Sequence, residues 1–183
     1  MRLVLIDRDG VLNEDRPGSV RSPAELVMID GSAEAVGRLN AAGFTLALVT
    51  NQSIVGRGEI DASVLDAIHD RLRERLAEAG GRLDALFVCT DHPARPTERR
   101  KPQAGMLREA LVRFGASAAE TPFVGDQLSD LEAAAAAGCP RVLVRSGKGA
   151  ATQADGLPDH VLPVSVHDSL AAWVDRHLAG PKP

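Results

Sequence analysis

Short apolar runs alternate with longer amphipathic segments along most of this chain. The first run, Leu3 to Ile6, has four apolar residues, two of them β-branched, which predicts a strand buried on both faces. Similar runs lie at residues 44–49, 83–88, 121–124 and 141–144. Apolar residues recur at helical spacing over residues 32–42, 61–79, 102–114 and 168–178, and in the alanine-rich stretch before Gly138. The pattern therefore predicts strands and helices in alternation.

This alternation is typical of βαβ units. We expect an α/β protein with a doubly wound, mainly parallel five-stranded sheet, Rossmann-like, with helices on both faces. Val161 and Leu162 are a further candidate for an edge strand, where Pro163 is tolerated. The polar segment 13–30, broken by prolines and glycine, predicts a loop that is too short to be a second domain. We therefore expect one domain over residues 1–183.

The charge balance narrows the class of partner. The 183 residues include 25 acidic and 21 basic side chains, a net charge of −4, which argues against nucleic acid and anionic membranes and favours a small metabolite. Cys89 and Cys139 show no CxxC spacing, which predicts reduced thiols in a cytoplasmic protein. A first strand at residue 2 or 3 leaves no room for a signal peptide, and no apolar run reaches the roughly 18 residues of a membrane span. We expect a monomer.

Polar residues gather where the predicted strands end. Asp7 and Asp9 follow the first strand, Thr50 and Asn51 follow the second, and Asp126 follows the fourth. The carboxyl ends of parallel strands meet at one edge of the sheet, where such folds bind ligands. We therefore expect these side chains to share one site.

Asp7 and Asp9 suit covalent phosphoryl transfer. A carboxylate fixed at the strand end attacks phosphorus, and the second carboxyl group protonates the leaving oxygen if its pKa is raised enough to hold a proton near neutral pH. The same stretch also fits a strand that ends in an Asx turn with Gly10. The other clusters favour the chemistry, since they add a hydroxyl, a cation at Lys101 and a further carboxylate for Mg²⁺.

Taken together, four clusters resemble the haloacid dehalogenase superfamily, over residues 2 to about 150. They are Asp7 to Gly10, Thr50 with Asn51, Lys101 before a helix, and Gly125 with Asp126 and Asp130. Within that superfamily the chain is similar to the group that contains the D-glycero-D-manno-heptose bisphosphate phosphatases and the histidinol phosphatases. This closer similarity rests on residues 7–13, 50–53, 57–58, 100–102, 105–106 and 125–130.

The resemblance implies a role for each of these residues. Asp7 would form an aspartyl phosphate, and Asp9 would donate a proton and later withdraw one. Mg²⁺ would be held by Asp7, Asp126 and the backbone carbonyl of Asp9. Asp130 has two implied interpretations, a water-mediated contact to the metal or a helix cap. The contacts implied to the phosphoryl group come from Thr50 and Lys101, and those to the rest of the substrate from Asn51, Arg57 and Arg100.

The chain departs from the group in two places. Members often carry a zinc loop with cysteines and histidine before the Arg-Lys-Pro segment, but here only Cys89 and His92 remain, with Asp91 between them. A structural zinc site takes four N or S ligands, so we expect no zinc and a loop held by its prolines, although a metal on Cys89, Asp91 and His92 stays open. Gln127 also stands where a lysine is frequent in the heptose enzymes.

The absence of a sizeable insertion after the first two strands implies a capless enzyme, covered only by loops 13–30, 52–60 and 89–100. Four arginines on these loops are candidates for binding a second anionic group of the substrate, and Arg57 and Arg100 are favoured because motif residues flank them. The other two are Arg16 and Arg99. The four histidines outside loop 89–100, His69, His160, His167 and His177, are expected far from the motifs, at the surface or in structural positions, and Lys148 is expected to be exposed.

The sequence therefore predicts a Mg²⁺-dependent phosphatase that acts on a small phosphorylated sugar through an aspartyl phosphate. D-glycero-D-manno-heptose 1,7-bisphosphate, cleaved at the 7-phosphate, leads because the loops offer more arginine than acid. Histidinol phosphate or a broad set of small phosphomonoesters is the alternative substrate. A non-catalytic phosphoryl sensor is the alternative of another class, but Asp9 has no use in a protein that must keep its phosphoryl group.

Overall fold

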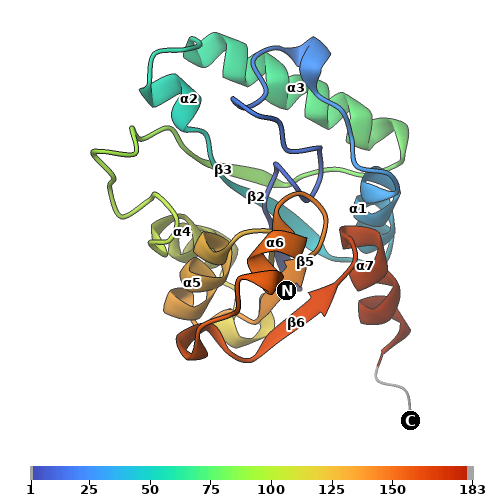
Figure 1. Ribbon diagram of the computed structural model, residues 1–183. Coiled ribbons are helices and arrows are strands. Elements are labelled where there is room, and N and C mark those ends of the chain that lie inside the picture. The colour runs from blue at the N-terminus through green and yellow to red at the C-terminus, as the bar shows by residue number, and fades with distance from the viewer. Residues whose placement is uncertain (1, 181–183) are drawn as a thin grey trace.

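A parallel sheet of six strands forms the centre of the computed structural model, which describes residues 2–180 (Figure 1). Residues 1 and 181–183 of the expected domain lie outside this described part. The strands are β1 (Leu3–Ile6), β2 (Thr45–Asn51), β3 (Ala85–Cys89), β4 (Phe123–Gly125), β5 (Arg141–Val144) and β6 (Val164–His167). The α-helices are α1 (Ser32–Ala41), α2 (Ser53–Gly56), α3 (Ala62–Glu78), α4 (Gly105–Phe114), α5 (Leu128–Ala137), α6 (Gly149–Ala154) and α7 (Leu170–Ala179).

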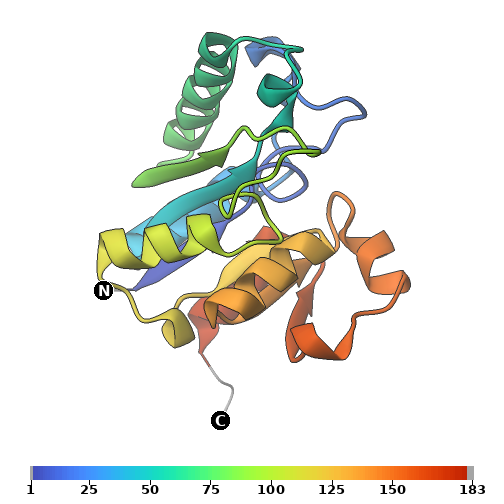
Figure 2. The same ribbon diagram turned by 90° about the vertical axis from the view of Figure 1, so that its left-hand side faces the viewer.

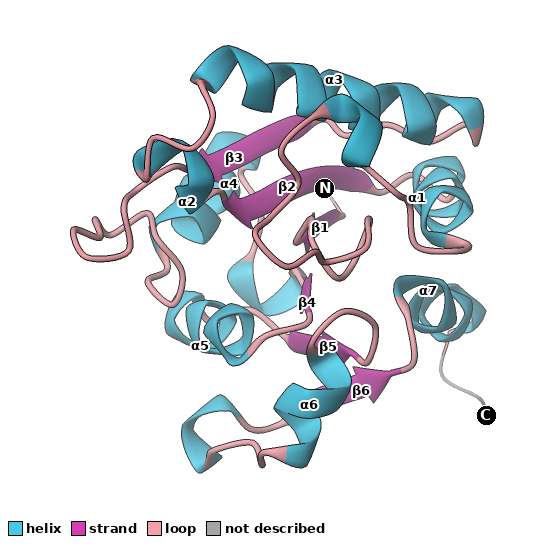
Figure 3. Ribbon diagram, turned by 45° about the horizontal axis from the view of Figure 1, so that its top comes forward, coloured by secondary structure: helices cyan, strands magenta, loops and turns pink. Residues whose placement is uncertain are grey.

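The sheet is doubly wound, as the alternation of elements predicts. Its strand order is β3-β2-β1-β4-β5-β6, and all neighbouring pairs are parallel. Figure 3 shows α4 and α5 on one side of the sheet and α1 and α7 on the other. Figure 2 looks onto the first of these layers, with α4 in yellow-green and α5 in orange before the strands. No helix within residues 2–180 is both long enough and apolar enough to cross a membrane.

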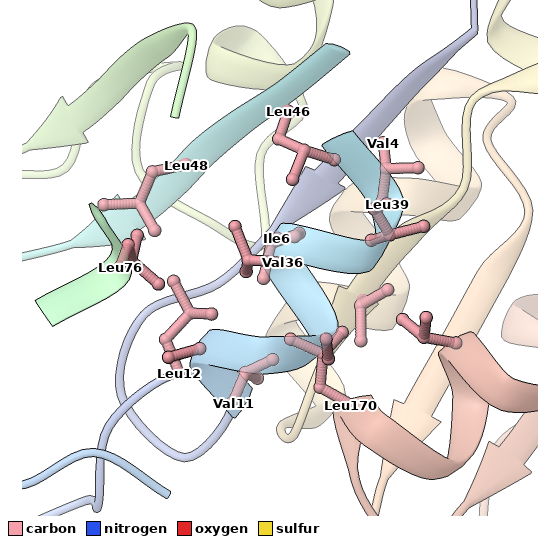
Figure 4. Close-up of a cluster of buried hydrophobic side chains, with 14 of the residues drawn as sticks. Val4, Ile6, Val11, Leu12, Val36, Leu39, Leu46, Leu48, Leu76 and Leu170 are labelled. Carbon is pink, nitrogen blue, oxygen red and sulfur yellow. The ribbon is translucent and has the colours of Figure 1, made fainter. Parts of the chain in front are cut away.

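Alternate side chains of the central strands face the two helical layers. Val4 and Ile6 of β1 and Leu46 and Leu48 of β2 pack with Val36 of α1 in the larger apolar cluster (Figure 4). The intervening residues of β1 and β2 pack with α4 and α5 in a second cluster. Because β1 is buried on both faces, the residue that follows it has a fixed position.

The sheet has one strand more than the five that the sequence predicts. β6 spans Val164–His167, beyond the candidate edge strand at residues 161–162, where a short 3-10 helix ends at Val161. Its residues Val164, Ser165, Val166 and His167 alternate between apolar and polar, but with four residues, three of them half-buried and one exposed, the strand has no continuous apolar run. An edge strand of this kind leaves a weak signal in the sequence.

Two element boundaries also differ from the expected ones. β2 continues through Asn51, so Thr50 and Asn51 belong to the strand rather than to the turn after it. α4 begins at Gly105 instead of near Pro102, because residues 100–103 form a turn in which the Gln103 N–H donates to the Arg100 carbonyl. The first difference places Thr50 and Asn51 in the sheet, and the second places Lys101 in the turn before α4.

The strand order reverses around β1, which has β2 on one side and β4 on the other. Asp7, Asn51 and Asp126 lie at the C-terminal ends of these three strands. In open α/β sheets this is the position where ligands bind. The fold thus brings the polar clusters of the sequence to one edge.

Candidate active site

Asp7 lies directly after β1 and is almost fully buried. Its backbone N–H donates to the Val124 carbonyl of β4 at 2.9 Å, which extends the pairing one residue beyond the strand. Its Oδ1 accepts a hydrogen bond from the Arg8 backbone N–H at 2.8 Å and lies 3.0 Å from Lys101 Nζ. The carboxylate therefore has the fixed position that a nucleophile requires.

Lys101 is a buried cation between two carboxylates. Its Nζ lies 3.0 Å from Asp7 Oδ1 and 2.6 Å from Asp130 Oδ1, and it donates to the Val49 carbonyl at 3.1 Å. Asn51 holds the Lys101 backbone, since its Nδ2 donates to the carbonyl at 3.0 Å and its Oδ1 accepts from the N–H at 3.1 Å. Asn51 thus links β2 to the segment before α4 and fixes the ammonium beside Asp7.

Asp126 follows β4 and is fully buried. Its Oδ2 accepts from the Lys148 backbone N–H at 2.8 Å, whereas its Oδ1 has no hydrogen-bond partner among the described residues. Gly10, at φ 81°, lies so close that a Cβ there would overlap the Asp126 carboxylate. Carboxylate oxygens of Asp7, Asp126 and Asp130 lie within 4.8 Å of one another. A buried acid oxygen without a donor, in a cluster of three acids, fits a hard divalent cation.

Asp130 makes the helix-cap contacts that are one of its two implied interpretations. Its Oδ2 accepts from the backbone N–H groups of Asp126 at 3.1 Å and Gln127 at 3.0 Å, which closes the first turn of α5 as a capping box. Its Oδ1 meets Lys101. Both oxygens are therefore used within the protein, and Asp130 also holds the ammonium that faces Asp7.

Burial and mutual repulsion raise the pKa values of two acids in this cluster. Burial is the larger cause at Asp7, whose pKa rises to about 7 although the Lys101 ammonium acts to lower it. Burial, followed by repulsion from Asp7 and Asp130, raises the pKa of Asp126 to about 8. Burial acts to lower the pKa of Lys101, but the two carboxylates outweigh it and hold that pKa well above its ordinary range. Without a bound cation, Asp7 and Asp126 therefore take up protons near neutral pH.

Asp9 is held by three side-chain donors. Its Oδ1 accepts from Arg8 Nη2 at 3.0 Å and from Asn13 Nδ2 at 2.9 Å, and its Oδ2 accepts from Gln52 Nε2 at 2.8 Å. Burial acts to raise the pKa of Asp9, but Arg8 and these hydrogen bonds outweigh it and lower the pKa. In the free protein Asp9 therefore lacks the raised pKa that a proton donor near neutral pH requires. A phosphate dianion beside Asp9 would raise the pKa and favour uptake of the proton.

Thr50 offers a hydroxyl group at the end of β2. Its Oγ1 accepts a hydrogen bond from Gln52 Nε2 at 2.8 Å. A hydroxyl group carries one hydrogen of its own, so that bond leaves the Thr50 O–H to donate to a phosphoryl oxygen. The Gln52 amide nitrogen is shared with Asp9, and it therefore orients the hydroxyl and the second acid together.

A polar cavity of about 280 Å³ adjoins these residues. Each of the three loops expected to cover the site contributes at least one residue to its lining. The lining residues are Asp7, Asp9, Asp15, Ser19, Thr50, Asn51, Ser53, Arg100, Lys101, Gln127, Ser129, Asp130 and Lys148. The cavity therefore brings together all the expected site residues except Arg57 and the fully buried Asp126.

The cations of the cavity lining differ in how they are used. Lys101 is taken up by Asp7 and Asp130, whereas Arg100 Nη1 makes only a long hydrogen bond of 3.4 Å to the Asp91 carbonyl. Lys148 is exposed, as the sequence suggests, and its Nζ also lies 2.9 Å from Asp15 Oδ2 at the cavity wall. Among the described residues of the lining, Arg100 is therefore the cation that no carboxylate holds and that is available to an anionic group of a ligand.

Arg57 lies outside the cavity lining. Its Nε pairs with Glu59 at 2.5 Å, and its Nη1 donates to Ser53 Oγ at 2.7 Å. Arg16 and Arg99 likewise bond to protein groups and do not line the cavity. Arg57 would reach a ligand only by leaving Glu59.

The loop of residues 89–100 is closed by hydrogen bonds, where the sequence suggests prolines alone. Asp91 Oδ2 accepts from the Thr97 N–H at 2.7 Å and from the Thr97 hydroxyl at 2.6 Å. Across residues 2–180, the three-ligand group positioned for a metal is the acid cluster described above, and it does not include Cys89 or His92. The absence of zinc stays a prediction.

Known proteins match this chain over almost its whole length. It is 45% identical over 179 residues to the D-glycero-beta-D-manno-heptose-1,7-bisphosphate 7-phosphatase of Bordetella bronchiseptica, which covers 97% of this chain and 98% of the relative. It is 43% identical over 170 residues to the protein of the same name from Pseudomonas aeruginosa, covering 93% and 94%. The chain belongs to the haloacid dehalogenase superfamily.

A solved structure and a family model agree that the chain belongs to the haloacid dehalogenase superfamily. The crystal structure of D,D-heptose 1,7-bisphosphate phosphatase from B. bronchiseptica, complexed with magnesium and phosphate, matches with a TM-score of 0.94 at 42% identity, over 99% of this chain and all of that chain. Residues 98–172 match the family model described as HAD-hyrolase-like. This haloacid dehalogenase protein is a phosphoric monoester hydrolase, and the sensor interpretation is therefore set aside.

Sequence reasoning left several residues of this haloacid dehalogenase site unassigned. Gln52, which belongs to the similar segment 50–53 but received no role, orders the site, and Asp15 and Lys148 line the cavity without a signal in the sequence. The placement of His69 away from the motifs is wrong, because its Nε2 lies 3.3 Å from Arg8 Nη1. Burial, then the charge of Arg8, lowers the pKa of His69 to about 4. Arg8 itself stands between the two aspartates, which is the one signal that the sequence offers for it.

Proposed function

We propose that this enzyme is a Mg²⁺-dependent phosphatase that removes the 7-phosphate of D-glycero-β-D-manno-heptose 1,7-bisphosphate. The chemistry rests on one observation: Asp7 is fixed at the strand end between the Lys101 ammonium and the Asp126 carboxylate, and faces a polar cavity. The choice of substrate is supported by relatives of this name that are 45% and 43% identical over nearly the full chain.

The side chains of the site divide the reaction between them. Asp7 attacks phosphorus and forms an aspartyl phosphate, while Asp9 gives its proton to the departing sugar oxygen. Water then attacks the phosphorus of the aspartyl phosphate, Asp9 takes the proton of that water, and phosphate and free Asp7 result. Lys101 and the Thr50 hydroxyl lie where they would hold phosphoryl oxygens during both steps.

Asp7 and Asp126 are the residues that would hold Mg²⁺. Asp126 Oδ1 is buried without a donor, and the acid cluster carries more negative charge than Lys101 alone offsets. When bound, the cation would neutralise charge on the transferring phosphoryl group. The B. bronchiseptica structure with magnesium and phosphate supports this assignment.

The raised pKa values of Asp7 and Asp126 predict how Mg²⁺ binding depends on pH. Below about pH 7 protons occupy these carboxyl groups, at pKa values of about 7 and 8, and must be displaced by the metal. At a fixed Mg²⁺ concentration, the rise in melting temperature should therefore be larger at pH 8.5 than at pH 6. Thermal melts of the protein at both pH values, with and without Mg²⁺, measure this. An Asp126→Asn variant should lose the effect at both, and an equal shift at both pH values in the unmodified protein would contradict the prediction.

The second phosphate of the proposed substrate needs a cation, and Arg100 is the better placed of the two arginines favoured from the sequence. Its guanidinium lines the cavity with only one long hydrogen bond, whereas Arg57 is held by Glu59. Arg100→Ala should raise KM for the bisphosphate by about 10-fold to 100-fold, the worth of a charge-assisted hydrogen bond, with a smaller change in kcat. Arg57→Ala is the matched variant and should raise KM less. A larger effect at Arg57 would reverse this assignment.

Phosphate release from a panel of compounds tests the proposed function. The panel contains both anomers of the heptose bisphosphate, histidinol phosphate and common sugar monophosphates, each with Mg²⁺. A kcat/KM that is highest for the β-bisphosphate, with one equivalent of phosphate released per molecule, is the expected result. Preference for histidinol phosphate, or flat activity over the panel, would leave the hydrolase chemistry in place and overturn the proposed substrate.

A further inference from the structure

Arg8 is a fully buried arginine whose side chain connects two parts of the fold. It lies in the turn after β1, and its Nη2 donates to Asp9 Oδ1 at 3.0 Å. Its Nη1 lies 3.3 Å from Nε2 of His69, a buried residue of α3 that is 61 positions away in the sequence. A buried guanidinium is costly unless all its directions are satisfied, so both contacts matter to where Arg8 lies.

The contact between Arg8 and His69 defines the state of the imidazole ring. A guanidinium has only N–H donors, so His69 Nε2 must be the acceptor and the ring must be neutral with its proton on Nδ1. The lowered pKa of His69 agrees with a neutral ring at all pH values above about 4. The charged neighbours Asp70 and Arg73 lie on the exposed side of α3 and pair with each other at 2.7 Å, so they do not compete for Nε2.

The hydrogen bonds of Asp9 distinguish its two oxygens. Oδ1 is occupied by Arg8 and Asn13, whereas Oδ2 receives only the Gln52 amide. Oδ2 is therefore the oxygen that can carry a proton to a leaving group. The hydrogen bonds that Arg8 and Asn13 donate to Oδ1 fix the direction in which Oδ2 points. Arg8 can keep Nη2 on Asp9 Oδ1 only if Nη1, the other nitrogen of its fork, is also held, and His69 Nε2 holds it.

We propose that His69 is a positioning residue for the second acid of the reaction. His69 holds Arg8 against α3, and Arg8 orients Asp9 so that Oδ2 faces the cavity. This inference rests on the acid and base role proposed for Asp9. The neighbours of His69 on α3, Leu65, Ile68 and Leu72, are buried in the apolar core or almost so. The anchor therefore stands on a rigid part of the molecule, as precise positioning requires.

Two substrates with different leaving groups distinguish a misplaced Asp9 from a general loss of activity. A sugar oxygen needs a proton as it departs, whereas p-nitrophenolate is stable enough to depart without one. Because kcat/KM reports the steps up to departure of the leaving group, the sugar phosphate that the unmodified enzyme cleaves best is compared with p-nitrophenyl phosphate. His69→Leu removes the acceptor, His69→Gln keeps an oxygen acceptor, and His160→Leu at an exposed histidine is the matched control.

In His69→Leu, kcat/KM for the sugar phosphate should fall by about 10-fold to 100-fold, the loss typical of a misplaced catalytic group, with little change for p-nitrophenyl phosphate. His69→Gln should recover most of the loss, and His160→Leu should match the unmodified enzyme for both compounds. An equal loss for both compounds, or no loss for the sugar phosphate, would overturn the proposal. If His69→Leu does not fold, the same ratio in Arg8→Lys, which lacks the forked donors, decides the question. Failure of the unmodified enzyme to cleave either compound would instead count against the proposed function.

Discussion

Replacing Asp7 by asparagine should abolish phosphate release and leave the fold intact. An amide has nearly the size of a carboxyl group, and its oxygen can still accept the Arg8 N–H hydrogen bond. Its oxygen is, however, a poor nucleophile, so the aspartyl phosphate cannot form. We expect kcat to fall by at least about 10⁴-fold, in line with the loss of other enzymatic nucleophiles. Steady-state phosphate release with the best compound of the panel measures this.

The same variant has a clear expectation for stability. Asp7→Asn removes one negative charge from three clustered acids, and Lys101 keeps its second partner, Asp130. The melting temperature without metal should therefore stay close to that of the unmodified protein. Asp66→Asn, at an exposed position of α3, should change neither activity nor melting temperature. Turnover by Asp7→Asn at a rate similar to that of the unmodified enzyme would contradict the covalent mechanism.

The fold could be predicted where strands are buried on both faces. β1 and most of β2 stand out because every residue between the turns is apolar and packs against helices on both sides. β6 could not be predicted, because an edge strand with half-buried residues has no continuous apolar run. Packing against a neighbour, rather than the local pattern, decides the position of that strand.

The site could be predicted where a strand end delivers the residue. Asp7 and Asp126 follow buried strands, so their meeting at one sheet edge follows from the topology. The partners that tune these acids could not be predicted, because they come from elements far away in the chain. His69 reaches Arg8 across 61 positions, and Asn51 holds the Lys101 backbone across 50. The pKa of Asp9, which the sequence leaves open, depends on how Arg8, Asn13 and Gln52 lie around its carboxylate, and only the folded chain sets that arrangement.

Replacing Lys101 by methionine should both destabilise the protein and remove its activity. The ammonium is 2% exposed and is shared by Asp7 at 3.0 Å and Asp130 at 2.6 Å. Methionine fills a similar volume but leaves two buried carboxylates without a cation. Removing one partner of a buried ion pair costs about 3–5 kcal/mol. Loss of a donor to the phosphoryl oxygens should lower kcat by about 10²-fold to 10³-fold, measured on protein that is still folded.

The cost of Lys101→Met should depend on pH, with a sign that follows from the acids. Asp7 already has its pKa raised from 3.8 to about 7 in the folded protein, so its protonated form favours folding and that contribution is lost as the pH rises through about 7. Without Lys101 the pKa of Asp7 rises further, so the loss of stability should grow between pH 5 and pH 8. Urea unfolding of both proteins at these two pH values measures the difference.

Lys148→Met is the control for Lys101→Met, because it removes a positive charge that is exposed rather than buried between two acids. Lys148 also pairs with an acid at the cavity, but its side chain is 56% exposed, so Lys148→Met should cost no more than about 1 kcal/mol and show little dependence on pH. Mg²⁺ should restore part of the stability of Lys101→Met at pH 8, because a cation at Asp7 and Asp126 replaces some of the missing positive charge. A loss of stability in Lys101→Met that is the same at both pH values would mean that packing, rather than charge, explains why this lysine is buried. Lys101 would then serve the reaction alone, and the acids would tolerate one another without it.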